Sequence, residues 1–172
     1  MRTKKATTDL ARNQKLKDVP KVYETMEDCI AARLTSAEKL CESTDFLTLR
    51  CSAANYIENN VLGPLEYCEW KKTHRNPFTA QDLKDVFNLL LQITNVFNEK
   101  VRYEPTIATF CRLACLSMNT VNAYTYQNDD LGDMAMIIQD YFKASLMQTM
   151  INGNIHPAPG QFIGKAALGM RE

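Results

Sequence analysis

The spacing of apolar residues after Thr79 is the feature of this sequence that most constrains the fold. These residues recur at every third or fourth position, which places them on one face of a helix of about 20 residues. They are Leu83, Val86, Phe87, Leu90, Ile93, Thr94 and Phe97. Thr79 and Asp82 have the spacing of an N-terminal cap. Similar patterns between Val22 and Gly63 and between Leu131 and Ile151 complete the prediction of an all-α fold.

The composition limits the kinds of protein that this chain can be. Its 172 residues, 45% of them hydrophobic, suffice for one main domain with appendages. Twenty basic and twenty acidic residues cancel, which excludes a uniformly basic surface and makes any DNA contact local. No run approaches the ~20 consecutive apolar residues of a membrane helix, and Met1–Leu10 lacks an apolar signal core. We therefore expect no membrane contact and a cytoplasmic location.

Four regions are expected along the chain. Residues 1–21 form a flexible basic arm with seven basic and two acidic residues, a net charge of +5 that suits phosphate contact, partner binding or a solvated terminus. Residues 22–75 form an N-terminal helical region of two helices, the second with an apolar run from Phe46 to Val61. Gly63 ends this region, and a basic connector around Trp70 follows. Residues 76–128 hold the Thr79 helix and a helix-turn-helix, and residues 129–172 hold a long oligomerisation helix and a C-terminal latch.

The segment from Pro105 to Tyr124 has the pattern of a helix-turn-helix. Its first helix turns Ile107, Phe110 and Leu113 to the core and places the small Ala108 where the two helices cross; Ser117 caps a second helix whose Val121 and Tyr124 point inward. The start of that second helix is where such a motif contacts base edges. We predict that the DNA-binding residues are Ser117, Met118, Asn119, Thr120, Asn122 and Ala123, with phosphate contacts from Arg112, Arg102, Lys4 and Lys5.

Two features keep open the alternative that this helix pair only packs. Cys115 stands in the turn, where glycine is common because one residue often needs a positive φ. The second helix carries no Arg or Lys between Ser117 and Asn128, so phosphate contacts must come from elsewhere. The candidates are Lys100, Arg102, Arg112, the connector and the basic arm.

The apolar surface from Leu131 to Ile151 is wider than one packing stripe needs. We expect one side to cover the helix-turn-helix and the other to contact a neighbouring subunit, although a helix central to a monomer's core would show the same pattern. The predicted oligomerisation residues are Leu131, Met134, Ile138, Phe142 and Met150. After Gly153, the expected latch comprises Phe162, Ile163 and Leu168.

No metal, cofactor or catalytic motif is evident. The six cysteines form no CxxC pair and lie apart from the two histidines, so we interpret them as small buried residues, with Cys111 and Cys115 on one helical face. The phosphate-binding loop GxxxxGK[ST], HExxH and GxSxG are all lacking. We expect a protein that is not an enzyme.

Four short motifs give residues 79–172 a resemblance to the small, DNA-packaging subunit of tailed-bacteriophage terminases. They are Pro105–Ala108, then Ser117 with Thr120 and Val121, then Gly153–Asn154, and finally Phe162, Lys165, Gly169 and Glu172. The resemblance implies a ring-shaped homo-oligomer in the cytoplasm of a bacterial host. It also implies that the protein recognises double-stranded viral DNA and presents it to a large subunit that hydrolyses ATP and cuts DNA.

Two other functions remain open at this point. A transcriptional or replication regulator of a phage or plasmid would use the same helix-turn-helix, usually as a dimer on a palindromic site. A helical assembly protein would use the helix pair for packing alone.

Overall fold

The computed structural model describes residues 25–152, and these residues confirm the all-α fold. They form seven helices and no strand: α2 (Met26–Ser43), α3 (Ala53–Asn60), α4 (Glu66–Thr73), α5 (Ala80–Asn98), α6 (Ile107–Leu113), α7 (Met118–Tyr124) and α8 (Asp130–Ile151). The basic arm with Lys4 and Lys5, and the expected latch, lie outside the described residues. Within residues 25–152, no helix combines the length and the apolar character needed to cross a membrane.

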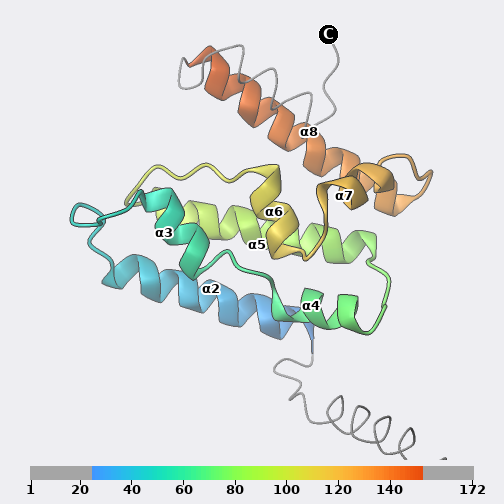
Figure 1. The fold of residues 1–172 in the computed structure, drawn as a ribbon, viewed down its shortest axis with the longest axis horizontal. Helices are drawn as coiled ribbons and strands as arrows, with labels where there is room; N and C mark the ends of the chain where they lie inside the picture. The colour runs from blue at the N-terminus through green and yellow to red at the C-terminus, as the bar shows by residue number, and fades with distance from the viewer. Residues whose placement is uncertain (1–24, 153–172) are drawn as a thin grey trace, which may run out of the picture.

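Helix α5 is the centre of the fold. α2 packs along one side of it and α8 crosses the other, while the short helix α6 also contacts α5 (Figure 1). Leu83, Leu90 and Ile93 of α5 are fully buried, because a central helix meets neighbours on several sides. A single hydrophobic cluster extends from Met26 to Phe142, so helices from all the predicted regions that the structure describes share one core.

The start of α5 agrees with the cap predicted from the sequence. The Thr79 side chain accepts a hydrogen bond from the Asp82 backbone N–H (3.2 Å), and the Asp82 carboxylate accepts one from the Thr79 N–H (2.7 Å). These paired bonds satisfy backbone donors that the first turn of a helix leaves free. The predicted helix of about 20 residues is confirmed as Ala80–Asn98.

The N-terminal region differs from the prediction in two places. The second apolar run was expected to be helical from Phe46, but α3 begins only at Ala53, where the Ser52 side chain caps the helix by accepting a bond from Asn55 N–H. The basic connector contains a helix, α4, which begins at Glu66. Glutamates in its first turn and lysines in its last turn complement the helix dipole, and this stabilises a helix that has few apolar residues.

One buried ion pair joins α4 to α5. The Lys71 ammonium contacts the Asp82 carboxylate and also donates a hydrogen bond to the Pro77 carbonyl oxygen (3.3 Å). The rings of Tyr67 and Phe78 lie 5.8 and 5.7 Å from the same ammonium. Lys71 therefore holds the end of α4 both to the start of α5, through Asp82, and to the segment between the two helices, through Pro77.

Candidate nucleic-acid interface

Helices α6 and α7 form the short helix pair in which the sequence predicted DNA contacts. Thr106 and Thr109 form a capping box at the start of α6, and the three residues expected in the core, Ile107, Phe110 and Leu113, are buried. Ala108 is exposed, which corrects its predicted place at the helix crossing. The adjacent Thr109 faces inward instead and donates to the Glu58 carboxylate (3.2 Å).

The connection between the two helices is a tight turn with a left-handed residue at Cys115 (φ 57°). Cys115 N–H donates to Arg112 O (3.2 Å) and Leu116 N–H donates to Cys111 O (2.9 Å). This bond pair is the Schellman motif that commonly ends a helix, usually with glycine at the left-handed position. The turn thus has a residue with the positive φ that such turns often need, with cysteine in the place of glycine.

The start of α7 exposes only part of the predicted reading face. Ser117 caps the helix by accepting from Thr120 N–H (3.0 Å), and Val121 is buried at 1% exposure. The side chains of Met118, Asn119 and Ala123 are exposed. The half-buried Thr120 is hydrogen-bonded to Ser117 through their hydroxyls (2.8 Å).

Asn122 does not have the exposure that we expected for it. It is half-buried, and its side-chain oxygen accepts a hydrogen bond from the Gln139 amide of α8. The reason is that α8 packs on this side of α7, which the sequence of the helix pair alone cannot show. The exposed set on α7 is therefore Met118, Asn119 and Ala123, next to the exposed cap Ser117.

Most of the cations proposed for phosphate contact have partners within the chain. Arg112 donates to Leu62 O and Glu58 O, both at 3.0 Å, and so joins α6 to the end of α3. Lys100 donates to Cys41 O (2.6 Å) at the end of α2. Arg102 is exposed and forms an ion pair with Glu104, the residue two positions along the chain.

Helix α4 lies directly against the turn between α6 and α7. Leu65 N–H, at the start of α4, donates to Leu113 O (2.9 Å), and the Cys115 thiol donates to Leu65 O (3.9 Å). The exposed residues Lys72, His74 and Arg75 stand at the other end of the same helix. The helix that contacts the turn through Leu65 thus carries basic side chains at its other end.

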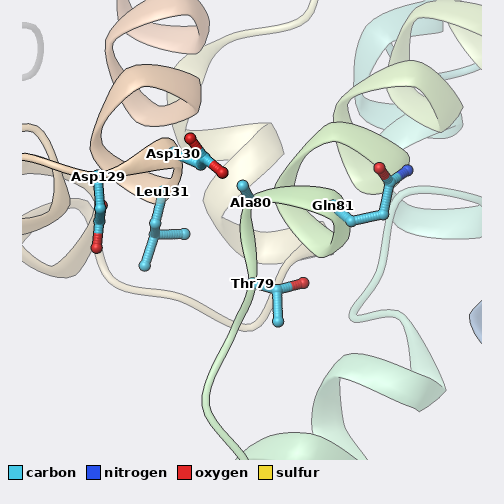
Figure 2. Close-up of a pocket in the computed structure, with 6 residues that line it drawn as sticks. All are labelled: Thr79, Ala80, Gln81, Asp129, Asp130 and Leu131. Atoms are coloured by element: carbon cyan, nitrogen blue, oxygen red, sulfur yellow. The ribbon is translucent and has the colours of Figure 1, made fainter.

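An open hollow lies where the N-termini of α5 and α8 meet. Figure 2 shows Thr79, Ala80 and Gln81 on one side and Asp129, Asp130 and Leu131 on the other. The Asp129 side chain is occupied as the cap of α8, accepting from Gly132 N–H (2.9 Å). With two carboxylates among its lining residues, this hollow is unsuited to phosphate.

The cysteines fit the interpretation as buried small residues in four of six positions. Cys29, Cys41, Cys68 and Cys111 are buried, Cys115 is half-buried and Cys51 is exposed, all as free thiols. Burial raises the pKa of Cys111 to about 11, which keeps its thiol neutral. Cys115 lies beyond the end of α6 at Leu113, so it does not share a helical face with Cys111 as predicted. No cluster of metal-binding side chains occurs among the described residues.

Helix α8 has two apolar faces. The inner face packs against the core: Ile138 and Phe142 are buried, and the Phe142 ring lies 6.2 Å from that of Phe87. These two residues therefore cannot line a contact with another subunit, which corrects our prediction for them. Leu131, Met134 and Met150 are half-buried. The outer face of α8 comprises the exposed residues Met136, Ile137, Met147 and Ile151. Tyr141 lies at the edge of this face, where its ring also packs against Phe87 of α5 (5.2 Å).

Comparisons with protein-family models, with curated proteins and with solved structures gave no match for this chain. Its function is therefore inferred from its own residues and geometry.

Proposed function

We propose that this chain is a non-catalytic protein that recognises double-stranded DNA through the start of α7. The observation that carries the proposal is the setting of α7. Ser117 and Val121 anchor the helix from its cap and its buried side, while Met118, Asn119 and Ala123 remain exposed. A short, anchored helix with free polar and small apolar side chains at its start suits the major groove.

The three exposed side chains suit base edges that can be named. An asparagine amide both donates and accepts, so Asn119 matches the N6 and N7 atoms of adenine. The methyl-bearing side chains of Met118 and Ala123 suit contact with the C5-methyl group of thymine. The interface proposed here is therefore one that prefers sites containing A·T pairs.

A role in viral DNA packaging follows from the resemblance of residues 79–172 to small terminase subunits. In that role the protein forms a homo-oligomeric ring through the outer face of α8. It binds the viral genome and presents it to a large ATPase-nuclease subunit in the bacterial cytoplasm. The exposed apolar side chains of α8 support the oligomer, because large apolar side chains gathered on one exposed face commonly mark protein contacts.

The test uses a duplex selected from a random-sequence library by the wild-type protein. Asn119→Ala should lose about 1 to 3 kcal/mol of discrimination between that duplex and a scrambled one, because a good base contact contributes that much. Asn95→Ala is the matched control, since Asn95 is exposed on α5, outside the α6–α7 pair. Fluorescence anisotropy with unlabelled competitor measures both variants.

The outcome that contradicts base recognition is equally specific. An Asn119→Ala protein that stays folded and keeps the full wild-type preference would remove α7 from the reading face. Circular dichroism identifies the folded variants, and the expected effect of Asn119→Ala on stability is within ~0.5 kcal/mol because the side chain is exposed.

A second candidate function is favoured by α8. If the outer face of α8 holds copies of the chain together while no duplex is selected from the library, the protein is a helical assembly protein. Its α6–α7 pair then serves only to pack against other helices. The hydrogen bond from Gln139 of α8 to Asn122 of α7 is a contact of this kind within the chain.

A further inference from the structure

The phosphate contacts of the proposed DNA site require cations that α7 does not carry. Arg112 and Lys100 donate to backbone carbonyls, and Arg102 pairs with Glu104. The start of α8 adds acidic residues, Asp130 and Asp133. Since phosphate neutralisation supplies much of the affinity for DNA, other cations must lie beside the helix pair.

Lys72 and Arg75 of the α4 end meet this requirement. Both are exposed, and neither side chain donates a hydrogen bond or forms an ion pair with another residue in 25–152. Among the same residues, the other exposed cations without such partners lie on segments with no hydrogen bond to the α6–α7 turn. They are Lys39, Arg50 and Lys84.

Direct bonds fix the position of α4 relative to this turn. Leu65 N–H donates to Leu113 O at 2.9 Å, and the Cys115 thiol contacts Leu65 O at 3.9 Å. Electrostatics agree: burial raises the pKa of Cys115 to about 11, Glu69 adds to this shift and Lys72 opposes it. Lys72 is therefore close enough to the turn to act on its thiol. In Figure 1, α4 and α7 both lie toward the N-terminal end of α5, with α4 below it and α7 above it.

Hydrogen bonds close the backbone at the α4 end, so less backbone entropy is lost when this segment binds a phosphate. Arg75 has a left-handed backbone (φ 54°), with Arg75 N–H donating to Lys72 O (3.3 Å) and Asn76 N–H to Lys71 O (2.9 Å). The His74 ring bonds to Trp70 O (2.9 Å) and stacks against the Trp70 ring at 5.0 Å. The backbone that carries both cations is thus held by its own hydrogen bonds.

From these observations we infer that Lys72 and Arg75 form a phosphate-binding flank of the DNA site, beside the base-reading start of α7. The inference rests on the proposed function and specifies which surface of the chain holds the DNA backbone. Because phosphate contacts carry no base information, this flank sets affinity and orientation but not sequence preference.

The test compares the salt dependence of binding to the selected and scrambled duplexes. The variant combines Lys72→Ala with Arg75→Gly, since glycine accepts the left-handed backbone that Arg75 has and should preserve the fold. Log affinity falls as log salt rises, and in the double variant this negative slope should become shallower by about 2, one unit per lost phosphate contact. The affinity for both duplexes should weaken by the same factor. A variant that combines Lys72→Arg with Arg75→Gly should recover part of the lost slope.

Lys39→Ala is the control, because Lys39 is an exposed cation near the far end of α2. It should leave the slope unchanged. If the wild-type protein binds and the double variant keeps the full slope, or if Lys39→Ala loses as much, the inference is overturned while the proposed function stands. If the wild-type protein selects no duplex, the proposed function fails and this inference fails with it.

Discussion

Arg75 and Cys115 are two residues with side chains in a backbone conformation that glycine normally takes. Each follows a short helix, α4 or α6, and each is held by the same pair of hydrogen bonds from its own N–H and that of the next residue. A left-handed residue with a Cβ costs about 1 to 2 kcal/mol. The bonds that close each helix therefore offset a local strain, and both strained residues adjoin the proposed DNA site.

The strain at Cys115 predicts an unusual order of stability between two small substitutions. Cys115→Gly should be more stable than Cys115→Ala by about 1 kcal/mol, because both remove the thiol and only glycine is free of the left-handed penalty. Urea unfolding followed by circular dichroism gives the difference. At an ordinary helical position the order is reversed, so Ala31→Gly on the exposed side of α2 should destabilise by about 0.5 to 1 kcal/mol. Equal stability of the two Cys115 variants would show that the turn relaxes without strain.

Lys71 and Lys72 are neighbours with opposite surroundings. Lys71 is buried against Asp82, whereas Lys72 is exposed. Lys71→Met should destabilise the fold by about 3 to 5 kcal/mol, because it leaves a buried carboxylate without its cation. The same change at Lys72 should stay within about 0.5 kcal/mol. A small effect of Lys71→Met in urea unfolding would mean that water or another donor replaces the lysine at Asp82.

At the scale of the helix, the elements that could be predicted are those marked by residues close together in the sequence, such as a cap or a regular apolar spacing. The apolar spacing after Thr79 and its capping box define α5, and Ser117 marks the start of α7. Helix α4 was missed because it has few apolar residues and no side-chain cap at Leu65. The ion pair that attaches it to α5, between Lys71 and Asp82, joins residues eleven positions apart. Sequence spacing cannot show such a pair.

The same limit applies to the faces of the predicted helices. The apolar residues of α6 were placed correctly, since Ile107, Phe110 and Leu113 share one face. The expected exposure of Asn122 was wrong because α8 covers it. The contact is made by Gln139, which lies seventeen residues further along the chain. The breadth of the α8 apolar surface was evident, but which side faces inward depends on how α8 crosses α5.

The junction of α7 with α8 is governed by Gly132. A Cβ at this position would lie 2.2 Å from the Gln127 carbonyl oxygen and 3.0 Å from that of Tyr124, both backbone atoms. Gly132→Ala should therefore destabilise the protein by at least about 2 kcal/mol, although the same change inside an open helix stabilises by up to ~1 kcal/mol. Thermal unfolding measures the effect.

Gly63 provides the control for this prediction. A Cβ on Gly63 would meet nothing within 4 Å, so Gly63→Ala should change stability little. An unaltered melting temperature for Gly132→Ala would mean that the loop before α8 moves aside freely. In that case the position of α7 would not depend on this contact.

For the whole molecule, the proposed DNA surface and the outer face of α8 belong to different parts of the fold. The first comprises α7 and the end of α4, and the second comprises the exposed apolar side chains of α8, the helix that crosses α5 (Figure 1). Subunits joined through α8 can therefore leave α7 and the α4 end open to DNA. This arrangement suits a protein that binds DNA as an assembly.

Aspartate substitutions at Ile137 and Ile138, two adjacent isoleucines of α8, test whether the protein is an oligomer. Ile137 is 57% exposed on the outer face and Ile138 is fully buried, because neighbours on a helix differ by about 100° in direction. Wild-type protein should have a mass by light scattering of more than two 19.6 kDa chains. Ile137→Asp should lower that mass to one chain with the helical circular dichroism intact. Ile138→Asp should unfold the chain, because a buried unpaired carboxylate costs several kcal/mol. A wild-type protein that is monomeric at micromolar concentration would remove the oligomer from the proposal, and the outer face of α8 would then need another explanation.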